Sequence, residues 1–228
     1  MEESIKYEAE IMLNIWPNLK ESRVSRILCL GAHSDDIEIG CGGTLLRLLE
    51  ELDDLEIWWI VFSGQSVRKK EAEHSAELFL KRAKKKKIII KDYQDGFFQY
   101  RGDKIKNYFE KLKKMYNPDM IFSHYENDLH QDHKFISGIT YQTFREQVIL
   151  EYEVLKYDGD IGSPNTYFFL DPRTCKEKVD LLLKCFNSQN KKHWYSGDAF
   201  RSVLRIRGIE SRAPSGYAEG FYCRKIAI

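Results

Sequence analysis

The chain has 228 residues, of which 43% are hydrophobic and 31% are charged, a balance that supports one sizeable globular domain and leaves too little chain for two. Its formal net charge of +1 provides no overall field that would attract nucleic acid or an anionic membrane. No apolar run approaches the roughly 20 residues that a membrane-spanning helix needs. We therefore expect residues 1–228 to form a single domain with no membrane span and no nucleic-acid partner.

Apolar runs and amphipathic stretches alternate through the first half of the chain. Short apolar runs that break at Gly31 and at Ser63 have the length and composition of buried parallel strands. The expected strands are residues 27–30, 55–62, 87–91 and 120–123, and the expected helices are residues 44–49, 67–85 and 103–116. This alternation predicts right-handed βαβ units, and hence an α/β fold whose mostly parallel sheet is covered by helices on both faces.

The remainder of the chain is less regular. Its expected strands are residues 154–157, 167–170 and 221–225, its expected helices are residues 175–187 and 199–207, and residues 159–165 are expected to form a loop over the sheet. A run of lysines and arginines between residues 81 and 87 is interpreted as the solvated end of the helix over residues 67–85, where cations offset the negative end of the helix dipole. An anion-binding patch is the alternative interpretation.

The five cysteines are scattered and include no CxxC pair. Cys29 lies within an apolar strand run and Cys185 within an apolar helical stretch, as is typical of buried, reduced thiols. Residues 1–4 are acidic and lack the basic start of a secretory signal. These features predict a protein of the cytoplasm.

Two clusters of polar residues follow the first and the fourth expected strands. Residues 31–36 read Gly-Ala-His-Ser-Asp-Asp, and residues 124–133 contain three of the six histidines of the chain. Ligands of doubly wound sheets bind just outside the carboxyl ends of the strands, so both clusters are expected at one edge of one sheet. Either cluster alone is equally compatible with a structural role, such as the capping of a helix by an aspartate. Together they favour a functional site.

The spacing within the clusters is typical of a metal site. His33 and Asp36 are three residues apart, so one tight turn can direct both side chains to a common point. His130 and His133 have the same spacing and would share one face at the start of a helix. Two imidazoles and one carboxylate with an open fourth position are the pattern of catalytic zinc, and a second carboxylate beside the first is then free to accept a proton. His124 is expected to end its strand too early to share the metal.

The two clusters resemble sequence motifs of the PIG-L/LmbE-like deacetylase family. Residues 32–36 (Ala-His-Ser-Asp-Asp) are similar to its AHPDD motif, and the match extends to Thr44. Residues 130–133 (His-Gln-Asp-His) are similar to its HPDH motif and are preceded by Asp128. Weaker matches are Arg68 with Glu71, Asp95 with Gly96, and residues 217–221, which resemble a Tyr-Ala-Glu-Ala-Phe ending.

The resemblance implies a Rossmann-like three-layer αβα sandwich with a mostly parallel sheet. It also implies a zinc-dependent N-deacetylase that hydrolyses the acetamido group of N-acetylglucosamine-like sugars in the biosynthesis of glycoconjugates. By this resemblance His33, Asp36 and His133 hold the metal, which is Zn²⁺ or another divalent ion such as Fe²⁺. Asp35 is then the general base that accepts a proton from water.

The same resemblance implies roles for four further residues. His130, as an imidazolium, stabilises the oxyanion and protonates the leaving amine, and Asp132 orients and charge-stabilises His130. Arg68 and Asp95 contact the substrate.

Several alternatives stay open at this point. Ser34 and Gln131 stand where the family motifs have proline, which removes a φ constraint and restores an N–H group, so the placement of the substrate is in doubt. The acetylated sugar is either a simple conjugate or linked to a nucleotide. Rival functions are deacetylation of a glucosamine-linked thiol precursor, and binding of metal or sugar without turnover, against which the free carboxylate of Asp35 argues. The oligomeric state, a homo-oligomer included, is also open.

Overall fold

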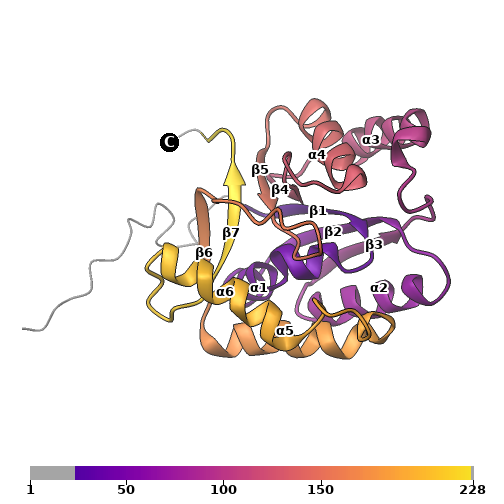
Figure 1. Ribbon diagram of the computed structural model, residues 1–228. Coiled ribbons are helices and arrows are strands. Elements are labelled where there is room, and N and C mark those ends of the chain that lie inside the picture. Colours follow the sequence, from indigo (N-terminus) through magenta and orange to yellow (C-terminus); the bar gives the residue numbers. More distant parts are fainter. Residues whose placement is uncertain (1–23, 227–228) are drawn as a thin grey trace, which may run out of the picture.

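The computed structural model describes residues 24–226 (Figure 1). Within this range the chain forms one seven-stranded sheet, in the order β3-β2-β1-β4-β5-β7-β6, and six α-helices. The strands are β1 (Arg26–His33), β2 (Glu56–Ser63), β3 (Lys85–Ile90), β4 (Met120–His124), β5 (Val148–Tyr152), β6 (Thr166–Phe169) and β7 (Ala218–Cys223). The helices are α1 (Asp36–Glu51), α2 (Ser66–Phe79), α3 (Gly102–Met115), α4 (Gln131–Thr143), α5 (Pro172–Cys185) and α6 (Gly197–Glu210), with short 3₁₀ turns η2 (Phe98–Arg101) and η3 (Asn187–Gln189).

The order of the strands places a crevice at the centre of the sheet. Strands β3, β2, β1, β4 and β5 pair in parallel, whereas β7 runs antiparallel to both β5 and β6. The predicted α/β fold is therefore confirmed, and its sheet is mixed. The chain moves outward from β1 through β2 to β3 and then returns to the other side of β1 with β4. Such a reversal opens a crevice at the carboxyl ends of the two central strands.

Both faces of the sheet are covered by helices. Alternate residues of β1 point to opposite faces, so Ile27 and Cys29 pack in one core while Leu28 and Leu30 pack in another. The first core includes residues of α1, α2, α5 and α6, and the second includes residues of α3 and α4. Figure 1 shows these two groups of helices on opposite sides of the sheet. Burial on both faces explains why the central strands read as continuous apolar runs.

Helices α1 and α2 differ most from their predicted bounds. Helix α1 begins at Asp36, so Gly40 lies inside it, and a Cβ atom at that position would lie 2.1 Å from the ring of Tyr152. Glycine thus allows the helix to pack closely against β5.

Helix α2 ends at Phe79, and residues 85–87 belong to β3. The basic run therefore does not form the last turn of the helix: residues 81–84 lie in the turn after α2, and the exposed residues 85–87 lie on an edge strand, where charge discourages pairing with another sheet.

The strand predicted over residues 154–157 is also wrong. The strand in this region is β5, which pairs with β4 from Val148 opposite Met120 to Tyr152 opposite His124. Residues 153–165 are irregular and include the loop predicted over residues 159–165. Within 154–157 only Val154 is buried, because the chain has left the sheet and runs beside the crevice.

Among residues 24–226 no helix has the length and apolarity needed to cross a bilayer.

Candidate functional site

The two predicted clusters meet at the carboxyl edge of β1 and β4. His33 ends β1, and Asp36 begins α1 directly after the two-residue turn 34–35. His130 is the N-cap of α4, and His133 lies in the first turn of that helix. Because β1 and β4 are hydrogen-bonded neighbours, both helices begin at the same edge of the sheet. The strand order thus brings together residues that lie about one hundred positions apart in the sequence.

Three ligand-type atoms lie within one small space. His33 Nδ1 is 3.1 Å from His133 Nε2 and 3.4 Å from Asp36 Oδ2, and His133 Nε2 is 3.5 Å from the same carboxylate oxygen. Ligands held about 2.0–2.1 Å from a tetrahedral zinc ion are about 3.3–3.5 Å apart. The backbone N–H of His33 donates to Asp36 Oδ2 at 2.6 Å and orients the carboxylate. The donor set and its spacing therefore fit a divalent metal ion.

His124 lies closer to this cluster than the sequence indicated. Its side chain is fully buried, its ring stacks on His133 with centroids 4.0 Å apart, and its Nε2 lies 3.2 Å from Asp36 Oδ2. Asp36, His124 and His133 therefore form a second group that could hold an ion. However, His124 Nε2 accepts a hydrogen bond from the backbone N–H of Ala32 at 2.8 Å, so its lone pair is already engaged. In the group of His33, Asp36 and His133, no backbone N–H of residues 24–226 is bonded to His33 Nδ1. All three of these residues line the cleft, whereas His124 does not.

A buried aspartate supports His133 from behind. Asp128 Oδ2 lies 2.9 Å from His133 Nδ1, and the same oxygen accepts a hydrogen bond from Lys156 Nζ at 3.0 Å. A carboxylate in this position fixes the orientation and tautomer of a metal-binding histidine. Burial alone would raise the pKa of Asp128, but the hydrogen bond to His133 and the charges around it hold that pKa well below its ordinary value. Asp128 was not among the predicted site residues, although it precedes the second motif.

The surroundings of His133 and His33 shift the pKa values of the two imidazoles in opposite directions. Burial and the neighbouring His124 lower the pKa of His133 to about 3, so its imidazole is neutral at neutral pH, as a metal ligand must be. Burial opposes the charged form of His33 as well, but the charge of Asp36 and contacts with Asp132 and Asp95 raise the pKa of His33 well above its ordinary value. An ion that binds at His33 therefore displaces a proton.

Arg68 and Asp95, which the resemblance assigned to the substrate, contact the cluster itself. Arg68 extends from α2, and its Nη2 donates to Asp35 Oδ1 at 2.7 Å. Asp95 Oδ1 lies 3.0 Å from His33 Nε2, although 71% of the Asp95 side chain is exposed. Arg68 thus fixes one oxygen of the carboxylate that was predicted to be the general base.

Asp132 meets His130 through its backbone and not through its carboxylate. The Asp132 N–H donates to His130 Nδ1 at 3.2 Å, whereas the carboxylate accepts from the N–H groups of Gly96 at 2.6 Å and Phe98 at 3.2 Å. Because His130 Nδ1 accepts this bond, the proton of the neutral ring lies on Nε2. Burial and the nearby His33 lower the pKa of His130. The arrangement thus favours a neutral His130, and the Asp132 carboxylate holds the 96–98 segment.

The two residues that replace prolines of the family motifs both form hydrogen bonds. Ser34 is buried and its hydroxyl donates to the carbonyl of Ser63 at 3.3 Å, which joins the ends of β1 and β2. Gln131 donates through Nε2 to the carbonyl of Gly96 at 2.7 Å, beside the bond that Asp132 makes to the same residue. Both substitutions therefore add contacts between the loops that carry the site.

A cleft of about 550 Å³ opens over the cluster. Of the predicted site residues it is lined by His33, Asp35, Asp36, Arg68, Asp95, His130 and His133, while Asp132 lies buried beneath. Its outer wall comes from residues that the sequence analysis did not identify, in the segments after β5 and after α5. They share no sequence motif, and Tyr157 was noted only as the end of the strand predicted over residues 154–157.

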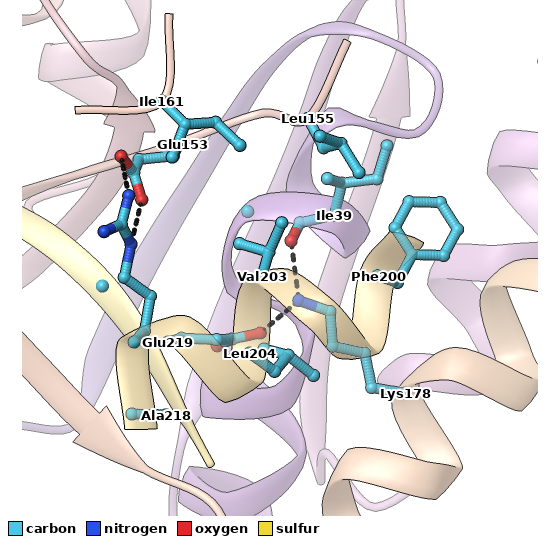
Figure 2. A pocket seen from close by; sticks show the side chains of 13 residues that line it. Ile39, Glu153, Leu155, Ile161, Lys178, Phe200, Val203, Leu204, Ala218 and Glu219 are labelled. Carbon is cyan, nitrogen blue, oxygen red and sulfur yellow. Dashed lines mark hydrogen bonds and ion pairs between the residues drawn. The ribbon is translucent and has the colours of Figure 1, made fainter. Parts of the chain in front are cut away.

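Residues 217–221, which resemble the Tyr-Ala-Glu-Ala-Phe ending, lie beside α1 and do not line the cleft. Glu219 of β7 accepts hydrogen bonds from the N–H groups of Gly43 at 2.8 Å and Thr44 at 2.7 Å, and pairs with Lys178 of α5 at 2.5 Å. Lys178 also donates to the carbonyl of Ile39 at 2.6 Å (Figure 2). The adjoining cavity of about 30 Å³ has room for water and none for a sugar. Glu219 therefore anchors the helix whose first residue is Asp36.

Solved structures that share this fold include enzymes of two chemistries. N,N′-diacetylchitobiose deacetylase from Pyrococcus horikoshii is 19% identical, with a TM-score of 0.70 over 92% of this chain and 86% of that one. A zinc-inhibited form of a teicoplanin deacetylase is 12% identical, with a TM-score of 0.66 over 87% and 97% of the two chains. The 4-carboxy-2-hydroxymuconate hydratase of Pseudomonas putida KT2440 is 15% identical, with a TM-score of 0.65 over 90% and 98%. At these identities the likeness establishes the fold alone.

The sequence itself identifies the family. The PIG-L family model, described as GlcNAc-PI de-N-acetylase, matches residues 28–144, which is more than half of the chain. The matched range begins in β1 and ends directly after α4, so it contains both polar clusters and the cleft residues between them. The chain therefore belongs to the PIG-L family of de-N-acetylases.

Proposed function

We propose that this protein is a metal-dependent N-deacetylase that removes the acetyl group from an amino sugar or sugar conjugate and releases acetate. The observation that carries the proposal is the set of three ligand atoms 3.1–3.5 Å apart, with the carboxylate of Asp35 beside them in an open cleft. A non-catalytic metal-binding relative would have no need for this second carboxylate. We also propose that residues 1–228 act as one domain in the cytoplasm, in agreement with five free cysteines.

The metal would be held by His33, Asp36 and His133. Two nitrogens and one oxygen suit Zn²⁺, and Fe²⁺ accepts the same donors. A divalent ion in such a site polarises the amide carbonyl and lowers the pKa of a coordinated water. A deacetylase of the same fold was solved in a zinc-inhibited form, so the test of this proposal compares the protein loaded with Zn²⁺ and with Fe²⁺.

The residues of the chain then divide the proton transfers of amide hydrolysis. Asp35 accepts a proton from water as the new C–O bond forms, and Arg68 holds Asp35 in place. His130, with its proton on Nε2, donates a hydrogen bond to the carbonyl oxygen, on which negative charge develops. When the C–N bond breaks, the proton taken up by Asp35 passes to the amine. The products are acetate and the free amino sugar.

An N-acetylglucosamine-like sugar is the proposed substrate because the matching family is described as a GlcNAc-PI de-N-acetylase and a structural neighbour is a diacetylchitobiose deacetylase. A nucleotide-linked amino sugar and a glucosamine-linked thiol precursor are the rival substrates. Because a hydratase has a similar structure, the fold by itself does not specify deacetylation, and the proposal depends on the site residues.

Acetate release by the purified protein tests the proposal. The protein, loaded with Zn²⁺ or with Fe²⁺, is given N-acetylglucosamine, N,N′-diacetylchitobiose and UDP-N-acetylglucosamine. We expect acetate from at least one of them, and a decrease of about 10²- to 10⁴-fold in kcat for Asp35→Asn, which keeps the size of the side chain but not its basicity. Asp35→Asn should retain its metal, whereas His33→Ala should lose it. Absence of acetate from every substrate with either metal would refute the proposed function.

A further inference from the structure

The cleft is larger than its metal-binding end requires, and its outer wall contains two aromatic rings. Tyr157, in the segment after β5, is 69% exposed, and Trp194, in the segment after α5, is half-buried. Both line the cleft together with His33 and Asp36. The two rings are in edge-to-face contact, with centroids 6.5 Å apart. A large exposed aromatic side chain in a cleft that also holds the reacting groups points to a ligand.

These rings are held in fixed positions. Trp194 packs edge-to-face on the buried rings of Tyr195 and Phe200, at centroid distances of 5.4 and 6.4 Å. The hydroxyl of Tyr157 accepts a hydrogen bond from the backbone N–H of His193 at 3.3 Å. Beside Tyr157, Lys156 bonds to Asp128, the residue that supports His133. The outer wall is thus connected to the metal-binding end through Lys156.

Polar groups accompany the rings. Gln189 lines the cleft and is only 4% exposed, and its Oε1 atom has no hydrogen-bond partner among the described residues. A buried acceptor of this kind is costly unless a ligand or water donates to it. Aromatic faces with interspersed hydrogen-bonding groups match the apolar C–H faces and the hydroxyl groups of a sugar ring.

The charges of the outer wall favour an uncharged ligand. Lys156 is neutralised by Asp128 at 3.0 Å and Asp160 at 2.5 Å. The other charged side chains of this wall are Lys192 and Asp158, which balance each other. A nucleotide diphosphate in this place would meet one cation and one carboxylate, so the wall offers it no net attraction.

We propose that Tyr157, Trp194 and Gln189 form a subsite for a second, uncharged sugar ring, attached to the sugar whose acetamido group reaches the metal. This proposal rests on the proposed function and narrows it, because the substrate is then an N-acetylated di- or oligosaccharide. In the cleft the first ring lies at the metal-binding end and the second ring stacks on the aromatic pair.

Comparison of a one-ring with a two-ring substrate tests the subsite. We expect wild-type protein to have a higher kcat/KM for N,N′-diacetylchitobiose than for N-acetylglucosamine. Trp194→Ala and Tyr157→Ala should each lower the ratio of these two kcat/KM values by about tenfold, since each removes one stacking partner of the second ring. Trp194→Phe should recover most of the ratio, because it keeps an aromatic face. Tyr100→Ala is the matched control, since Tyr100 is an exposed tyrosine that does not line the cleft, and it should leave the ratio unchanged.

Two results would overturn the subsite. One is an unchanged ratio in both aromatic variants, and the other is a wild-type preference for UDP-N-acetylglucosamine over the disaccharide. If the wild-type protein releases no acetate from any of the sugars, the proposed function fails while the subsite stays testable. In that case calorimetric titration with N,N′-diacetylchitobiose should still show binding that is about tenfold weaker in Trp194→Ala, and equal binding by wild type and variant would reject the subsite.

Discussion

The position of a single oxygen atom, Asp36 Oδ2, organises the candidate metal site. It lies 3.2–3.5 Å from nitrogens of His33, His124 and His133 and accepts the backbone N–H of His33 at 2.6 Å. Burial alone would raise the pKa of Asp36, but the surrounding histidines hold that pKa well below its ordinary value. Residues that are not ligands themselves, such as Asp128 beside His133, orient the ligand side chains around this atom.

Asp128 is the residue whose effect on the metal can be measured most directly. Asp128→Asn should weaken metal binding by about 10- to 100-fold, because the hydrogen bond that orients His133 is lost or reversed. A competition titration with a chelator measures this affinity. Asp160→Asn is the matched control, since Asp160 shares Lys156 with Asp128 but does not touch His133. Equal affinities in wild type and Asp128→Asn would show that Asp128 serves only the surrounding loops.

At the scale of the elements, one aspartate joins the starts of two central strands. Asp119 precedes β4, and its carboxylate accepts hydrogen bonds from the N–H and hydroxyl groups of Ser25 and from the N–H and guanidinium groups of Arg26, at 2.9–3.1 Å. Burial alone would raise the pKa of Asp119, but these hydrogen bonds lower it below its ordinary value. The amino ends of β1 and β4 are therefore fixed opposite the site.

This lowered pKa predicts a stability difference that depends on pH. A folded-state pKa below the unfolded value stabilises the fold fully above the unfolded value of about 3.9, and the effect is lost as the pH falls through the folded value. Asp119→Asn should therefore lower the free energy of unfolding by about 1–3 kcal/mol at neutral pH, and the difference from wild type should shrink below about pH 4. Urea unfolding across this range measures it, with the exposed Asp54→Asn as control. A difference that stays constant with pH would show that the charge of Asp119 is not what holds the strands.

At the scale of the whole molecule, a buried ion pair joins elements that are far apart in the chain. Lys178 of α5 and Glu219 of β7 bond to each other and to the backbone of α1 (Figure 2). Both side chains are almost completely buried, so each needs the other to offset the cost of removal from water.

Removal of one partner should be far more harmful than removal of both. Glu219→Gln should lower the free energy of unfolding by about 3–5 kcal/mol, because it leaves the ammonium of Lys178 buried without its counter-charge. A Lys178→Met, Glu219→Gln double variant should recover part of this loss. The exposed pair of Glu50 with Arg173 provides the control, and Glu50→Gln should cost no more than about 1 kcal/mol. Denaturant unfolding measures all four proteins, and a single-variant cost as small as that of the exposed pair would contradict the assignment.

The α/β architecture and the location of the site could be predicted from the sequence because both depend on local patterns. The apolar run before Gly31 could bury both of its faces only inside a parallel sheet, and a polar cluster directly after such a run has to lie at the carboxyl edge. The set of His33, Asp36 and His133 was expected from the resemblance to the family motifs, and the three residues come together because β1 and β4 are neighbours in the sheet. Strand β5 was missed because the apolar residues Val154 and Leu155 follow it closely, and the strand of this region was assigned to residues 154–157 instead.

Only the tertiary structure decided which side chains touch one another across the edge of the sheet. Arg68 pairs with Asp35, and the Asp132 carboxylate binds the 96–98 segment, because helix α2 and that segment cross the edge at particular positions. Tyr157 and Trp194 meet in one cleft although each belongs to an irregular segment with no periodic pattern. Such contacts join residues more than thirty positions apart, and their geometry depends on the packing of the whole chain. Local sequence patterns therefore determined the α/β fold and the edge of the sheet where the site lies. Long-range packing determined which side chains contact the site residues and the shape of the cleft.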